Sequence, residues 1–171
     1  MKRKFLHVIP VILCMVFIFY MSHQPATVSG KMSTKAGVEI GKILEPEFEN
    51  FTTAKKISYA EHIDFWVRKT AHICEYVLLG CLMAHAFIIF QKDRRRFGTR
   101  TWLLYGWGAC VIYAITDEVH QLFISGRGCG VRDMCIDGVG AFLGIVFYVC
   151  VIERVWKLVL RKNNKISDET E

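Results

Sequence analysis

The sequence predicts an all-α membrane protein, a polytopic bundle of four transmembrane helices. Hydrophobic residues make up 53% of the 171 residues, and the charged residues gather between apolar runs. Four of these runs approach the roughly 20 residues that a helix needs to cross the hydrocarbon core of a bilayer. Basic residues cluster before the first run, between the second and the third, and after the fourth. Since such clusters stay on the cytoplasmic side, we expect both termini to be cytoplasmic.

The four predicted spans cover residues 5–21, 70–90, 102–124 and 134–152. They form one transmembrane domain, residues 1–156, which a cytoplasmic tail, residues 157–171, follows. The first run could also be a signal peptide, because Lys2, Arg3 and Lys4 precede it. It is longer than the about 7–15 apolar residues of a signal peptide and no Ala-x-Ala site follows, so a retained span is favoured.

The formal net charge is +6, and the basic residues gather at positions 2–4, 92–100 and 154–165. This distribution indicates orientation in the bilayer and attraction to anionic lipid. It argues against a nucleic-acid partner, and the hydrophobic content excludes a soluble globular domain.

The connection between the first two spans, residues 22–69, is predicted to be extracytoplasmic. Apolar residues recur at Ala36, Ile40 and Ile43 before Pro46, with charged residues between them, a pattern typical of a short amphipathic helix. We expect it to lie on the outer leaflet or to cover the mouth of the bundle. A second candidate helix, residues 58–69, carries aromatic residues suited to the membrane interface.

Ionisable side chains interrupt three of the predicted spans. Placing such a side chain near the bilayer centre costs roughly 2.5–3.5 kcal/mol, so these residues usually face a bundle interior and have partners. At 100° per residue they fall on one face of each helix. They are Arg68, His72 and Glu75 at the second span, Asp117 and His120 on the third, and Asp133 and Asp137 on the fourth. On the third span the polar Gln121 shares the face, and Glu118 lies to one side of it.

These faces are expected to meet near the outer surface. The third span starts inside near Trp102, so Asp117 lies about 15 residues or roughly 22 Å farther, in the outer leaflet. Ser22 and Gln24 end the first span on the same side. Arg127 lies in a tight turn expected at residues 125–128, from which its guanidinium could hold an anion. The sequence therefore predicts an outward-facing polar site.

Two glycines on the fourth span, Gly140 and Gly144, are predicted to pack against a neighbouring helix. They lie on the same face as Asp137 and form a small-xxx-small pair, which allows two helices to approach closely.

Several chemical interpretations of the polar cluster stay open. His72, Glu75, Asp117 and His120 offer nitrogen and oxygen ligands at helical spacing that would suit a divalent metal such as Zn²⁺ or Mn²⁺. A proton relay and a purely structural ion network are the alternatives. The seven cysteines include no Cys-x-x-Cys pair, although a bridge between Cys129 and Cys135 is open.

Four motifs in order along the chain resemble the VanZ-like membrane proteins. These are Ser22-His23-Gln24-Pro25, Arg68-Lys69-x-Ala71-His72-x-x-Glu75-Tyr76-x-x-Leu79-Gly80, Asp117-Glu118-x-His120-Gln121-x-Phe123, and Gly126-Arg127 followed by Asp133, Asp137 and Gly140. The resemblance covers roughly residues 1–156. It implies a bacterial plasma membrane location and, as for the namesake of the family, low-level resistance to the glycopeptide antibiotic teicoplanin.

Three classes of function follow, and whether the protein is an enzyme is left open. The first is a non-catalytic envelope protein that binds a precursor, a lipid head group or the antibiotic. The second is an intramembrane enzyme that acts on a lipid-linked phosphate or glycan, and the third is a small transporter or flippase. No phosphate-binding loop or inverted repeat in the sequence favours the enzyme or the transporter, so a non-catalytic binding protein is the favoured class.

Overall fold

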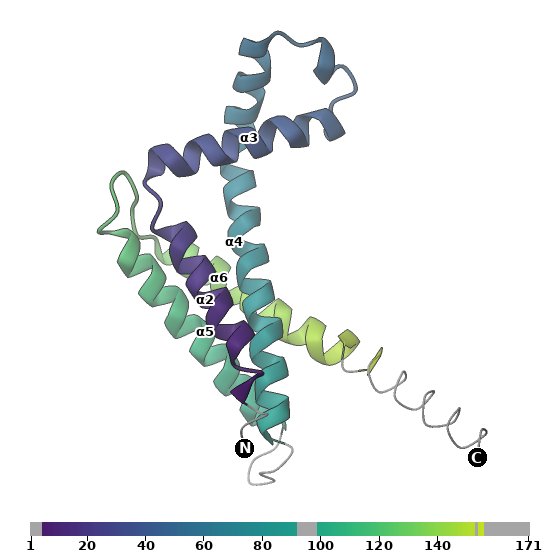
Figure 1. Cartoon of the computed structure of the whole chain (residues 1–171), viewed down its shortest axis with the longest axis vertical. Helices are drawn as coiled ribbons and strands as arrows, with labels where there is room; N and C mark the ends of the chain where they lie inside the picture. Colours follow the sequence, from purple (N-terminus) through teal and green to yellow (C-terminus); the bar gives the residue numbers. More distant parts are fainter. Residues whose placement is uncertain (1–4, 92–98, 153, 156–171) are drawn as a thin grey trace, which may run out of the picture.

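The computed structural model describes residues 5–91, 99–152 and 154–155 (Figure 1). All regular structure in this part of the chain is helical, as predicted. The predicted cytoplasmic tail, residues 157–171, and most of the three basic clusters lie outside the described residues. The elements are α2 (Ile9–Ser22), α3 (Ala26–Leu44), the 3₁₀ turn η1 (Phe48–Asn50), α4 (Thr53–Gln91), α5 (Thr99–Gln121), α6 (Val131–Phe147) and the π-helix η2 (Tyr148–Ile152).

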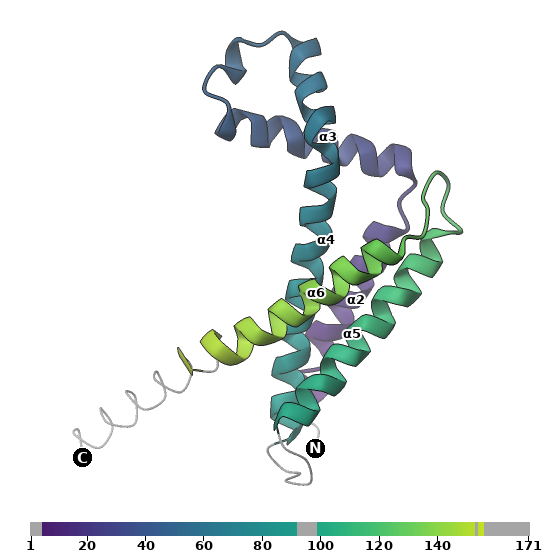
Figure 2. The ribbon, with the colours of Figure 1, turned by 180° about the vertical axis from the view of Figure 1, so that it is seen from behind.

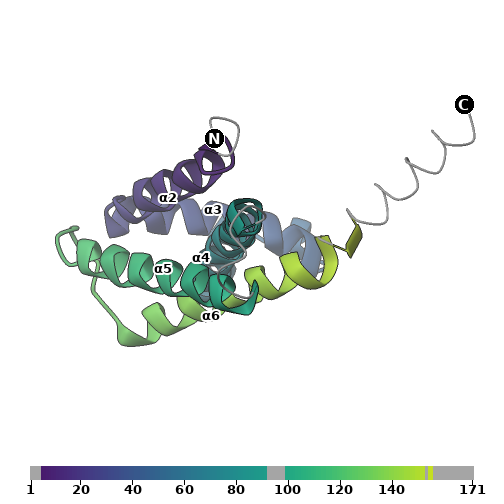
Figure 3. The ribbon, with the colours of Figure 1, turned by 90° about the horizontal axis from the view of Figure 1, so that it is seen from below.

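α2, α4, α5 and α6 form a bundle in which successive helices alternate in direction (Figures 1 and 2). Nδ1 of His7, just before α2, lies 3.0 Å from Nε2 of His85, near the end of α4. Ser22, which ends α2, instead bonds to Asp117 near the end of α5. Figure 3, which looks along α4, shows α5 between α2 and α6. We refer below to the end of the bundle where α2 meets α3 as the α3 end.

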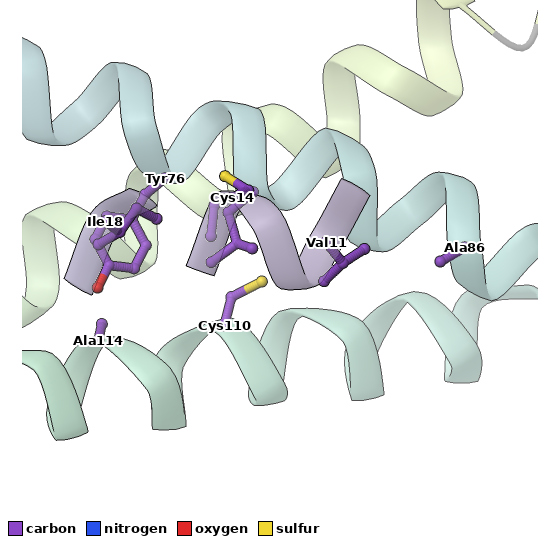
Figure 4. Packing of buried hydrophobic residues seen from close by; sticks show 9 residues of the cluster. Val11, Cys14, Ile18, Tyr76, Ala86, Cys110 and Ala114 are labelled. Atoms are coloured by element: carbon purple, nitrogen blue, oxygen red, sulfur yellow. The ribbon is translucent and has the colours of Figure 1, made fainter. Parts of the chain in front are cut away.

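Small side chains dominate the core where α2, α4 and α5 meet. Cys14 and Ile18 of α2 lie against Tyr76 of α4, and Cys110 and Ala114 of α5 complete the contact (Figure 4). Because small residues let helix backbones approach closely, this composition is typical of helix contacts in membranes.

α4 is longer than the predicted second span. It begins at Thr53, not at residue 70, and its 39 residues extend about 58 Å, roughly twice the about 30 Å of a hydrocarbon core. The predicted span begins where charged residues give way to apolar ones, but charged residues do not by themselves end a helix. No Gly or Pro lies between residues 53 and 79 to interrupt it. Residues 58–69, predicted as a separate helix, are therefore part of α4.

α3 turns away from α2 by 105° and lies across the projecting half of α4 (Figure 2). Pro25 separates the two helices because it has no N–H to continue α2, and it caps the start of α3. A Cβ on Gly37 would lie 3.0 Å from that of Ala60 on α4, so the two helices touch closely. α3 contains the predicted amphipathic helix, whose contact with the outer leaflet stays a prediction.

Two helical segments among the described residues are long and apolar enough to cross a membrane, Thr53–Phe90 and Val131–Val151. α2 and α3 pass this test only as a bent pair, which would make three. α2 alone has 14 residues, and α5 carries the acidic pair Asp117 and Glu118 near its end. The described chain is therefore a helical protein with two to three apolar candidate spans.

Candidate functional site

A cavity of about 470 Å³ opens at the α3 end of the bundle. Its walls come from α3, α4 and α6, together with the ends of α2 and α5 and the connection between α5 and α6. This volume is typical of small-molecule sites. Most of the predicted site residues line it, namely Gln24, Arg68, His72, Glu75, Glu118, Gln121, Arg127, Asp133 and Asp137.

Three acidic side chains at the site are almost wholly buried. Asp117 and Glu118 are 2% exposed and Asp137 is 1% exposed. Glu118 Oε2 accepts a 2.9 Å hydrogen bond from the N–H of Gly130, the residue that caps α6. In the described part of the chain, Oδ2 of Asp137 has no hydrogen-bond partner, and none of the three acids forms an ion pair with Lys or Arg. The buried end of the site, where these three acids lie, therefore has more acidic groups than basic ones. We call it the closed end below.

Ser22 and Asp117 lie one layer behind the cavity wall. Ser22 Oγ donates a 2.7 Å hydrogen bond to Asp117 Oδ2, and Gln121 Nε2 donates a 3.2 Å bond to the same oxygen. Neither Ser22 nor Asp117 lines the cavity itself. The network joins the ends of α2 and α5, so these two predicted site residues support the wall that Gln121 forms.

Two ion pairs lie nearer the mouth of the cavity. Arg68 lies 2.7 Å from Asp64 one turn earlier on α4. Lys69 lies 2.5 Å from Asp133 in the first turn of α6 and so ties the two helices together. Asp64 and Lys69 were not predicted as site residues. The i, i+4 spacing of Asp64 and Arg68 in the sequence could have indicated this ion pair, and so Asp64.

Arg127 fastens the α5–α6 connection to the end of α2. Its Nε donates a 2.9 Å hydrogen bond to the carbonyl oxygen of Gln24, and one terminal nitrogen donates a 3.3 Å bond to that of Met21. The other terminal nitrogen lies 3.4 Å from Oε1 of Gln121. Burial lowers the pKa of the guanidinium, and the Asp117 carboxylate acts in the opposite direction. The side chain thus donates to two carbonyl oxygens at the end of α2, of which that of Met21 also accepts a 3.3 Å bond from the N–H of Gln24.

His72 and Glu75 share one face of α4, as predicted, with Nδ1 of His72 3.9 Å from Oε2 of Glu75. This is longer than a hydrogen bond. No three His, Cys, Asp or Glu side chains in the described part of the chain are arranged to hold a metal ion. The predicted ligand set is not brought together, because His120 lies elsewhere. Cys129 and Cys135 are both free thiols.

His120 does not line the cavity. Its Nε2 lies 3.1 Å from Nδ1 of His23, and its ring stacks on Phe19 with 4.3 Å between ring centroids. His120 follows Asp117 by three residues, so the two side chains are about 60° apart around the helix. That offset turns the imidazole towards α2 while Asp117 stays buried.

Three glycines bring α4 and α6 into contact beneath the cavity. A Cβ on Gly144 would lie 2.0 Å from the carbonyl oxygen of Val77, and one on Gly80 would lie 2.1 Å from that of Ala141. A Cβ on Gly140 would lie 3.1 Å from the nearest carbonyl oxygen of α4. Gly140 and Gly144 were predicted as packing residues, whereas their complement on α4, Gly80, was not. This contact holds the polar faces of α4 and α6 together.

These features define a class of protein, a helical bundle with apolar candidate spans and a polar cavity to which several separate segments contribute acids. The chain belongs to the VanZ/LLP1 family, whose model matches residues 7–153. The match spans every helix of the bundle and confirms the resemblance that the four motifs indicated. No curated protein and no solved structure matches the chain.

Proposed function

We propose that this protein is a multi-pass protein of the bacterial plasma membrane that binds the polar part of a cell-envelope molecule in this cavity. The bound molecule is an envelope precursor, a lipid head group or a glycopeptide, and binding lowers susceptibility to antibiotics of the teicoplanin type. The observation that carries the proposal is the cavity itself, because charged groups from separate segments line one space of ligand size. Isolated ion pairs that only held helices together would not need such a space.

In this proposal α2, α4, α5 and α6 each cross the membrane, and both termini are cytoplasmic. The alternating directions of the four helices support this arrangement, because a chain that crosses a membrane several times must reverse its direction at each crossing. The basic clusters at residues 2–4, 92–100 and 154–165 support the orientation. The cavity and α3 would then face the outside.

Cysteine labelling tests this topology. In a background without the native cysteines, Lys42→Cys on α3 and Arg127→Cys in the α5–α6 connection are expected to react with a membrane-impermeant maleimide in intact cells. Arg154→Cys, beyond η2, is expected to react only after the membrane is opened. Labelling of Lys42→Cys only after disruption would reverse the orientation and remove the outward-facing site.

Charge-removing substitutions test the function. Glu75→Gln, Asp117→Asn and Asp137→Asn keep the shape of each side chain and remove a buried charge, so insertion and folding should be preserved. We expect each variant to lose most of the effect on teicoplanin susceptibility when expressed in a susceptible bacterium without its own copy. Glu61→Gln, an exposed acid outside the cavity, is the control and should keep the effect.

The amount of folded membrane protein must be measured in the same cultures. If susceptibility follows that amount across the series, the acids are an ion network that stabilises the bundle, and the binding proposal fails. Turnover of envelope lipids by the purified protein would instead support the enzyme hypothesis, and uptake into proteoliposomes would support a transporter.

A further inference from the structure

The charges around the cavity do not balance at its closed end. The two cations nearest the mouth are already paired, Arg68 with Asp64 and Lys69 with Asp133. The N–H groups of Arg127 are directed at two carbonyl oxygens and an amide oxygen. The remaining charged groups are acids, and none of them has a Lys or Arg partner in the described part of the chain. They are Glu75, Glu118 and Asp137 in the cavity wall and Asp117 behind it.

Asp137 gives a second and independent indication of a ligand. It lines the cavity, yet the residue is 1% exposed and its Oδ2 has no hydrogen-bond partner among the described residues. A buried carboxyl oxygen without a donor is unfavourable, since it has lost its water and gained nothing in exchange. A donor supplied by a bound molecule would satisfy it.

We propose that the cavity binds a primary ammonium group, held among Glu75, Glu118 and Asp137. This assignment deepens the proposed function and rests on it for the role of the cavity. An ammonium group offers three N–H donors and one positive charge, which suits a site in which Glu75, Glu118 and Asp137 have no Lys or Arg partner among the described residues. The described side chains do not form a metal site, so an organic cation fits better than a divalent ion. The volume of about 470 Å³ leaves room for the rest of an amine-bearing head group.

A primary ammonium group can reach the cavity from the bilayer or from water. The full-length protein is therefore reconstituted in phosphatidylcholine nanodiscs and titrated with ethylammonium chloride, with tetramethylammonium chloride at equal ionic strength as the comparison. A second set of nanodiscs contains phosphatidylethanolamine in place of part of the phosphatidylcholine. Thermal melting is followed in both sets.

Ethylammonium, phosphatidylethanolamine or both should raise the melting temperature by roughly 5 °C near saturation, and tetramethylammonium, which has no N–H donor, should not. A response to the lipid alone assigns a membrane source, and a response to ethylammonium alone assigns a soluble one. A response to both shows that the site takes the ammonium group from either source. Asp137→Asn should weaken the apparent affinity by about tenfold or more. Glu75→Gln, at a more accessible position, provides a second variant should Asp137→Asn fail to fold, and Glu61→Gln should respond as the unmodified protein does.

An equal response to tetramethylammonium, no response to either amine, stabilisation by Mg²⁺ alone, or an unchanged response in Glu75→Gln and Asp137→Asn would overturn the assignment. The cell assay separates this failure from that of the proposed function. If no amine binds but Asp137→Asn still abolishes the effect on teicoplanin at constant folded protein, only the ammonium assignment fails. If the amine binds and susceptibility is unaffected by the substitutions, the resistance role fails while the site stands.

Discussion

Gly144→Ala is expected to lower the melting temperature of the protein in detergent by roughly 6–12 °C. The added Cβ would lie 2.0 Å from the carbonyl oxygen of Val77, an atom of the α4 backbone that no side-chain rotation can move aside. α4 and α6 would have to separate along the contact that also contains Gly80 and Gly140. Forced separation of a well-packed interface costs about 3 kcal/mol, at the upper end of the usual range for overpacking.

Gly108→Ala is the matched control. Gly108 also lies inside a helix, but a Cβ there meets nothing within 4 Å. Alanine favours a helix over glycine by about 1 kcal/mol, so this variant should melt at the same temperature as the unmodified protein or slightly higher. Equal melting of the Gly144→Ala and Gly108→Ala proteins would show that α4 and α6 do not meet as described. The cavity, whose walls depend on that contact, would then need another explanation.

Helical periodicity predicted the polar faces of the site well. His72 and Glu75 on α4 and Asp133 and Asp137 on α6 lie together in one cavity wall, as their spacing indicated. The small-xxx-small pattern also predicted the close packing at Gly144. Both features depend on which residues share a face of one helix. The rotation of about 100° per residue gives that face from the sequence alone.

The parts that sequence reasoning missed depend on contacts between helices. The spacing on α5 separates His120 from Asp117 by about 60°, but it does not show that Phe19 of α2 lies where the His120 ring can stack on it. Residues 58–69 were predicted as a helix, but not as one continuous with the second span, because charged residues separate the two apolar patterns. Two of the three partners of Arg127 are backbone carbonyls, which every residue has, so the sequence does not identify them.

Arg127→Met is expected to destabilise the α3 end of the bundle by about 2–3 kcal/mol. Methionine keeps much of the length and apolar stem of arginine but has no N–H donor, so the carbonyl oxygens of Met21 and Gln24 lose a charged partner. The acids of the site also lose the one lining cation that makes no ion pair in the described chain. Melting in detergent should fall by roughly 4–12 °C.

Hydrogen exchange gives this prediction a local measurement, and Arg132→Met is its control. Arg132 is exposed and its guanidinium lies 5.6 Å from the ring of Phe65, a contact that contributes about 0.5–1 kcal/mol. In the Arg127→Met protein, amides of residues 122–130 and of the α2–α3 junction should exchange faster, because one side chain fastens both segments. In the Arg132→Met protein they should not. Equal exchange in the two variants would mean that the α5–α6 connection is held by its own turn, at Gly126 with φ of +74°, and not by Arg127.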